Sequence, residues 1–266
     1  MKTDSARSGR RTALLSTYAT YAMIGITAWP IADMTHEVLG HMTAAWLVRD
    51  PILSLSTVAI QTAAASRTVS AAGTLAQLVI GAVCLIIFDH SRRRTTFTYF
   101  LWTLAAFNLL SSGYLVASAL VGGDWAAVIR GLSPAWAWTW GLVAVGATIY
   151  AASLSWLSSC MARKAMGQQH LKRMVLASYF GGGAICTLAS AFNPISPRLI
   201  LISGIGASFG LTAGILWVPS IVAKRARKEP RPCLPEPTPG PGWIIAAVVV
   251  GATYVAVFGP GIHFHA

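Results

Sequence analysis

Apolar segments long enough to cross a bilayer recur along the whole chain, and they constrain its fold more than any other feature. The chain has 266 residues, of which 55% are hydrophobic and only 11% are charged. A soluble globular domain contains about 25% charged residues. Each membrane-crossing helix needs about 20 apolar residues, so this length allows roughly six to eight such helices. The sequence therefore predicts an all-α polytopic membrane protein and argues against a soluble enzyme.

Seven or eight apolar segments are candidates for membrane-crossing helices. They cover residues 12–30, 31–48, 70–88, 95–121, 134–157, 175–192, 199–222 and 243–258. Residues 1–222 form the predicted membrane-embedded core. Residues 223–242 contain six prolines and predict an extended cytoplasmic linker. Residues 243–266 then form a last transmembrane span with an outer tail.

Basic residues gather between the apolar segments and set the predicted orientation. The clusters are Arg92 to Arg94, then Arg163, Lys164, Lys172 and Arg173, then Lys224, Arg225, Arg227, Lys228 and Arg231. Cytoplasmic loops of membrane proteins carry an excess of Lys and Arg. We therefore expect a cytoplasmic N-terminus and an outer C-terminus. The net charge of +12 forms no continuous basic face, so we expect no nucleic-acid partner.

Near the N-terminus, the predicted orientation does not agree with the number of apolar segments. Three apolar segments lie between Arg11 and Arg92, yet both residues are expected on the cytoplasmic side, which requires an even number of crossings. Either residues 31–48 do not cross fully, or residues 51–67 dip into the membrane. Leu53 to Gln61 partly alternates polar and apolar residues and contains β-branched ones, as strands do. We expect a short re-entrant strand or hairpin there, beside a site.

One group of ionisable residues interrupts an otherwise apolar stretch. Asp33, His36, Glu37 and His41 fall within nine residues. Charged groups at membrane depth cost a few kcal/mol each on insertion scales, so they are functional candidates. In the HExxH pattern, two histidines four residues apart hold zinc on one helix face while the glutamate acts as general base. The group therefore indicates a metal site.

The spacing of the two histidines differs from that pattern by one residue. The sequence reads HEVLGH, which places His36 and His41 about 140° apart on a regular α-helix at roughly 100° per residue. A single π-bulge, or an opening of the helix at Gly40, would return both to one side. In the alternative, the helix stays regular, Glu37 and His41 pair at i,i+4, and Asp33 completes a carboxylate-rich site. We favour the two-histidine site.

These residues resemble motifs of the site-2-protease group of intramembrane zinc metalloproteases. His36 to Ala45 (HEVLGHMTAA) is similar to their HE-x-GH-x-x-A-A helix with one residue added, and a membrane-associated β segment follows in that family. Ala72 to Gln77 (AGTLAQ) resembles their A-G-P-x-A-N segment, with Thr and Gln at the Pro and Asn positions. Asn108 to Ser111 resembles the start of N-x-x-P. The resemblance covers roughly residues 30–130.

The resemblance implies an activity and roles for individual residues. It implies peptide-bond hydrolysis of a membrane-protein substrate in or near the lipid bilayer, with Zn²⁺ as cofactor. His36 and His41 would be zinc ligands, with Asp124 as the third, although Asp124 lies later than the family's L-D-G motif. Glu37 would be the general base. Asn108 would contact the substrate backbone.

Other interpretations remain open at this point. The chain could be a non-catalytic scaffold or metal-binding relative, or an ion transporter whose path is lined by Asp33, Glu37 and His41. Asp124 could instead cap a helix that begins at Trp125. A di-iron hydroxylase would need about eight histidines, and the chain has six. Gly206, Gly210 and Gly214 form a small-xxx-small ladder, typical of close helix packing within a chain or between two copies.

Overall fold

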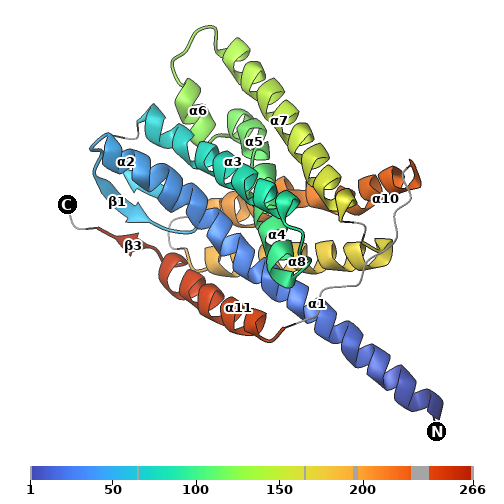
Figure 1. Cartoon of the computed structure of the whole chain (residues 1–266). Helices are drawn as coiled ribbons and strands as arrows, with labels where there is room; N and C mark the ends of the chain where they lie inside the picture. Colours follow the sequence, from blue (N-terminus) through green and yellow to red (C-terminus); the bar gives the residue numbers. More distant parts are fainter. Residues whose placement is uncertain (1, 65, 165, 194–196, 229–239, 265–266) are drawn as a thin grey trace.

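The computed structural model describes residues 2–64, 66–164, 166–193, 197–228 and 240–264. This part of the chain is mostly helical, with one small three-stranded sheet (Figure 1). The all-α prediction is confirmed at this level. The predicted linker lies largely outside the described residues, between α10 and α11.

The helical elements follow one another with short connections. The first stretch is continuous through α1 (Lys2–Met34), the π-helical η1 (Thr35–Met42) and α2 (Thr43–Leu47). After a β-hairpin come α3 (Arg67–His90), α4 (Thr96–Leu110), α5 (Gly113–Val121), α6 (Asp124–Ile129), α7 (Ala135–Arg163) and α8 (Gln168–Ser190). The remaining elements are α9 (Pro197–Leu199), the π-helical η2 (Ile200–Gly210), the 3₁₀-helical η3 (Leu211–Trp217), α10 (Val218–Lys228), α11 (Gly242–Thr253) and the π-helical η4 (Tyr254–Phe258).

Four helical stretches within the described residues are long and apolar enough to cross a membrane. They are Arg67–His90, Thr96–Val121, Ala135–Arg163 and Ile200–Arg227. The expectation of seven or eight such segments is therefore not supported. The structure supports membrane character for this protein through these four helices, by their length and composition.

The other predicted segments are not among these four helices, and the structure shows a physical reason for each. Segments 12–30 and 31–48 belong to one continuous helical stretch that runs through Pro30, and this stretch is not among the four helices that are long and apolar enough. Segment 175–192 lies in α8, whose polar side chains and three consecutive glycines make it less apolar. Segment 243–258 forms an apolar helix, Gly242–Phe258, that is shorter than the four.

The core forms where α1 crosses α8 and α4. Large side chains such as Tyr21, Trp102 and Phe107 are almost completely buried there. A side chain at Gly25 would collide with the backbone of Ser178, so a residue without a Cβ lets α1 and α8 approach closely. This contact holds α1 firmly, and α1 leads directly into the helix that carries the HEVLGH motif.

The sheet lies at the end of the molecule where α2 ends (Figure 1). Strands β1 (Ile52–Leu55) and β2 (Ile60–Thr62) form an antiparallel hairpin, so the strand or hairpin expected over residues 53–61 is confirmed. The order is β2-β1-β3, because β3 (Ile262–His263) pairs with the other edge of β1. The sequence did not predict this third strand.

Asp50 closes the base of the hairpin. Its Oδ1 accepts a 2.7 Å hydrogen bond from the backbone N–H of Ala64. Burial opposes ionisation of this carboxyl, but the donors around it, Ala64 first, hold its pKa below the usual value. A charged carboxylate therefore connects the chain before β1 to the chain after β2.

The glycine ladder is only partly available for contact with a second copy. Gly214 is buried, and a Cβ there would collide with the hydroxyl of Tyr150 on α7 of the same chain. Gly206 and Gly210 are exposed. The change from π-helix to 3₁₀-helix after Gly210 breaks the regular α spacing that the ladder assumed. An oligomer through these glycines stays a prediction.

Candidate metal centre

The helix that carries HEVLGH is π-helical from Thr35 to Met42. The backbone N–H of Thr43 bonds to the carbonyl of Val38, five residues earlier, which is the π register. His36 and His41 are also five residues apart, and their Nε2 atoms lie 2.9 Å from each other. The π register is therefore observed, over eight residues rather than as the single bulge that the sequence suggested, and the regular-helix alternative is wrong.

Asp124 approaches the two histidines from a different part of the chain. Its Oδ2 lies 3.3 Å from Nε2 of His36 and 3.2 Å from Nε2 of His41. Asp124 is the first residue of α6, and the cap of that helix is Gly123, with no side-chain cap bond. The alternative that Asp124 caps the helix is not supported. The three side chains form a group that could hold a metal ion.

Hydrogen bonds on the far side of each imidazole favour metal binding on the near side. Nδ1 of His41 lies 2.6 Å from the carbonyl oxygen of Val69, which can only accept. Nδ1 of His36 lies 3.0 Å from Oε1 of Gln77. If both Nδ1 atoms donate, both Nε2 atoms keep a lone pair. Metal-ligating histidines usually show this arrangement, with the second nitrogen bonded to a carbonyl or carboxylate.

The orientation of the Gln77 amide is itself fixed by its neighbours. Its Nε2 donates to the carbonyl oxygen of Ala32 and to the hydroxyl of Ser111. The Ser111 hydroxyl can accept because it donates its own hydrogen to the carbonyl oxygen of Phe107. The amide oxygen must therefore point at His36. This chain of bonds links α4, α3 and α1 to a single imidazole nitrogen.

Two glycines let η1 lie directly against α3. A Cβ at Gly40 would collide with the backbone of Gly73, so the two backbones touch. A Cβ at Gly73 would lie 2.6 Å from Nε2 of both His36 and His41. Only glycine at position 73 leaves room for both imidazoles.

A short loop and a tryptophan place Asp124. Gly122 and Gly123 have φ values of +100° and +135°, a backbone conformation that side-chain-bearing residues rarely adopt. The next residue, Trp125, is held at two points. Its backbone N–H bonds to the Ser118 hydroxyl at 2.8 Å, and its indole N–H bonds to the Thr74 hydroxyl at 3.0 Å. The loop thus turns the carboxylate of Asp124 toward the histidines.

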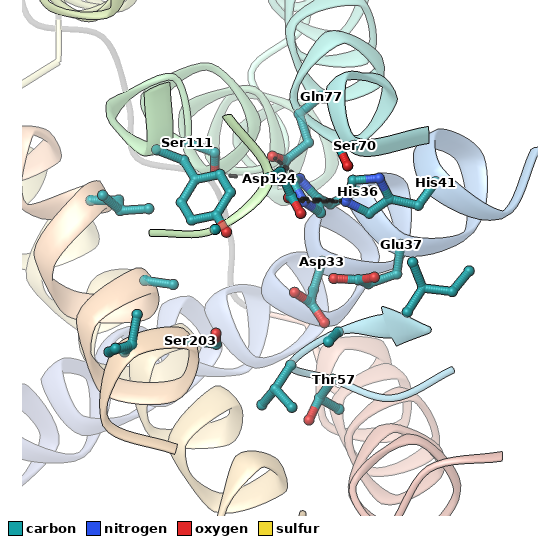
Figure 2. A pocket seen from close by; sticks show the side chains of 18 of the residues that line it. Asp33, His36, Glu37, His41, Thr57, Ser70, Gln77, Ser111, Asp124 and Ser203 are labelled. Carbon is teal, nitrogen blue, oxygen red and sulfur yellow. Dashed lines mark hydrogen bonds and ion pairs between the residues drawn. The ribbon is translucent and has the colours of Figure 1, made fainter. Parts of the chain in front are cut away.

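A cavity of about 850 Å³ lies beside the metal-ligand group. Its walls come from η1, the β-hairpin, the start of α3, the loop before α6, and η2. Figure 2 shows Asp33 and Glu37 pointing into the same space next to His41, with Thr57 of the hairpin and Ser203 across from them. The cavity gives a second molecule access to the metal-ligand group.

Glu37 is buried at the edge of this cavity. Ile60 on β2 lines the cavity together with Glu37. The Oε2 atom of Glu37 is buried and has no hydrogen-bond partner. Asp33, one turn earlier, is held differently, because its carboxylate accepts a 2.9 Å bond from the Tyr254 hydroxyl. Glu37 therefore lies in the wall of the cavity with one carboxylate oxygen that no other group satisfies.

Asn108 lies apart from the other predicted site residues. Its side chain is fully buried in α4, and its amide donates to the carbonyl of Leu104 one turn earlier. It does not belong to the described residues that line the cavity. The predicted contact with a substrate backbone has no support in this position and stays a prediction.

Some residues that shape the site carry only weak signals in the sequence. Gln77 and Gly73 fall in the AGTLAQ segment, whose resemblance to a family motif does not predict contact with a histidine. Trp125 carried no signal beyond its place after Asp124. The Tyr254 bond to Asp33 joins residues 221 positions apart. No local pattern encodes such a contact.

Comparisons of the chain with protein-family models, with curated proteins and with solved structures gave no match. The resemblance to intramembrane metalloproteases therefore rests on the motif residues alone.

Proposed function

We propose that this protein is a membrane-embedded zinc metalloprotease that hydrolyses peptide bonds of a membrane-protein substrate in or near the bilayer. The observation that carries the proposal is the convergence of His36, His41 and Asp124 next to the buried carboxylate of Glu37. A structural zinc site is usually closed by a fourth protein ligand, whereas three ligands leave one position open. The carboxylate of Glu37 beside this group, at the edge of a large cavity, supports a reaction.

The ligand set suits zinc. Two imidazole nitrogens and one carboxylate oxygen are typical of catalytic zinc sites, which use three protein ligands and leave a fourth position open. The bonds from Nδ1 to Val69 and Gln77 supply the outer contacts that such ligands normally have. The absence of a side chain at Gly73 lets both imidazole Nε2 atoms lie together. The residues present therefore fit a zinc ion.

A bound zinc ion would supply a polarised water molecule and an electrophile for the carbonyl oxygen of the substrate. Glu37 lines the cavity beside the metal-ligand group and would take a proton from the attacking water. It would then return that proton to the leaving amine. Burial of Glu37 beneath the hairpin keeps bulk water away from this carboxylate.

The decisive variant is Glu37→Gln, which keeps the size of the side chain and removes the base. We expect zinc content to remain at one ion per chain while cleavage falls by about 100-fold or more, the range seen when a general base is lost. Zinc is measured by elemental mass spectrometry. Cleavage is followed as new protein termini in membranes of the producing cells, mapped by mass spectrometry.

The matched control is the same isosteric change at Glu236, in the proline-rich segment outside the described residues. It should leave both zinc content and new termini unchanged. If wild type and Glu37→Gln generate the same termini, the protein is not a protease that uses this carboxylate. If wild type binds zinc and generates no termini, the scaffold interpretation replaces the enzyme.

A further inference from the structure

The helical ends that carry most of the basic residues meet in space. Arg163 at the end of α7 pairs with Asp89 at the end of α3, with 2.7 Å between nitrogen and oxygen. Lys164 donates to the carbonyl oxygens of Asp89 and Ser91. Arg225 of α10 bonds to Ser155 near the end of α7. We call this region the basic end, and Figure 1 shows α10 beside the end of α7 there.

Cations are unequally divided between the two ends of the molecule. The basic end collects Arg92 to Arg94, Arg163, Lys164, Lys224, Arg225 and Arg227, and the start of α8 adds Lys172 and Arg173. The opposite end, around the hairpin and α6, has only Arg49, Arg67, Arg130 and Arg198 among the described residues. By the positive-inside rule, the basic end faces the cytoplasm.

The length of α3 gives the distance from the basic end to the metal-ligand group. Gly73, which touches both histidines, lies sixteen residues before Asp89 on the same helix. At about 1.5 Å per residue, the group lies about 24 Å from the basic end. The hydrocarbon core of a bilayer is about 30 Å thick. The group therefore falls in the leaflet away from the cytoplasm.

Exposed tryptophans mark the second interface at the same end as the metal-ligand group. Trp136, Trp138 and Trp140 at the start of α7 are 70%, 48% and 59% exposed, and Trp46 at the end of α2 is 76% exposed. Tryptophan is enriched where a bilayer meets water. Both helices reach this interface beside the hairpin and α6, which wall the cavity.

We infer that the metal-ligand group and its cavity exchange metal and substrate with the non-cytoplasmic side of the membrane. The inference deepens the proposed function, on which it rests for its substrate class: a polypeptide segment presented at the non-cytoplasmic face. The cavity walls nearest this face are the hairpin and the loop before α6, which carry Thr57 and Gly123. Substrate segments on the cytoplasmic face would be separated from Glu37 by most of the bilayer.

Sealed vesicles of both orientations test this inference with the full chain. Zinc-loaded protein is exposed to EDTA, which does not cross membranes, on one side at a time, and the retained zinc is measured. We expect at least about 80% loss when EDTA faces the non-cytoplasmic side and no loss from the cytoplasmic side, because a bilayer excludes the charged chelator. Equal loss from both sides, or loss from the cytoplasmic side alone, would overturn the inference.

Single cysteines provide a measurement that does not depend on zinc. Ala64→Cys beside the hairpin and His90→Cys at the basic end both replace exposed residues. The native Cys84, Cys160 and Cys186 are buried, and Cys233→Ser removes the fourth. A membrane-impermeant maleimide should label Ala64→Cys only from the non-cytoplasmic side and His90→Cys only from the cytoplasmic side. Any other labelling pattern would overturn the inference that the cavity faces the non-cytoplasmic side. If the labelling follows this pattern but the protein contains no zinc, only the proposed function is overturned.

Discussion

The two halves of the candidate metal centre are held in different ways. The histidine half consists of η1 packed on α3, where glycine backbones touch and the far nitrogen of each imidazole has a partner. The carboxylate half consists of the loop Gly122–Gly123 and the start of α6, where Asp124 is placed through its neighbour Trp125. The first half is rigid helix packing, and the second is a loop attached at two points.

The difference predicts how each half responds to substitution. A change inside a close helix contact has nowhere to relax, because interiors are packed at nearly crystalline density. A loop held by single hydrogen bonds can shift at a cost near that of one bond, about 0.5–1.5 kcal/mol. Changes in the histidine half should therefore weaken metal binding more than changes in the carboxylate half.

The largest effect is expected for Gly73→Ala. The added methyl would lie 2.6 Å from Nε2 of both His36 and His41, so the imidazoles must separate. Overpacking of this kind costs about 1–3 kcal/mol, and a loss of about 100-fold in zinc affinity corresponds to the upper part of that range. Zinc affinity is measured by competition with a chelator of known affinity.

Gly141→Ala is the matched control for this change. Gly141 lies in α7, and nothing lies within 4 Å of the position its Cβ would take. Zinc affinity should stay unchanged and stability should stay equal or rise slightly, since alanine favours helix over glycine. Equal zinc affinity in both variants would show that the histidines do not bind metal at the observed positions.

Gln77→Met should have an intermediate effect. It keeps a similar volume but removes the acceptor for Nδ1 of His36 and the bonds to Ala32 and Ser111. Loss of an outer contact to a ligand typically costs about 10- to 100-fold in metal affinity. We expect about 10-fold, together with a larger share of the Nε2–H tautomer of His36, measured by nitrogen NMR of the metal-free protein.

The control for Gln77→Met is Gln61→Met on the hairpin. Gln61 lines the same cavity and bonds to the hydroxyl of Ser54 rather than to a histidine. It should leave the His36 tautomer unchanged. An unchanged tautomer in Gln77→Met itself would mean that Gln77 supports the fold without orienting the imidazole.

The histidine half was also the half that the sequence predicted best. The extra residue in HEVLGH left few ways to bring His36 and His41 together, and the i→i+5 register was one of them. Local spacing alone carried that prediction, because both residues lie on one helix. The spacing could not decide between a π-bulge and a regular helix. That choice depends on packing of the histidines against Gly73, a contact that the spacing within HEVLGH does not reveal.

The carboxylate half and the helix count depend on contacts distant in sequence. Asp124 lies 88 residues from His36, and its selection rested on the order of motifs. Hydropathy marked apolar stretches but could not tell that the helix continues through Pro30, so two spans were counted where one helix exists. The two-residue strand β3 is defined only by its pairing with β1, and no pattern within Ile262–His263 indicates it.

The smallest effect should come from Trp125→Phe in the carboxylate half. The change removes the indole N–H bond to Thr74 but keeps the backbone bond from residue 125 to Ser118. The lost hydrogen bond is worth about 1 kcal/mol, and only part of this free energy affects the position of Asp124. We therefore expect zinc affinity to decrease by about 3-fold. Trp136→Phe, at an exposed tryptophan of α7, is the control and should have no effect. A loss as large as that of Gly73→Ala would show that the loop is as tightly constrained as the helix pair, and the distinction between the halves would fail.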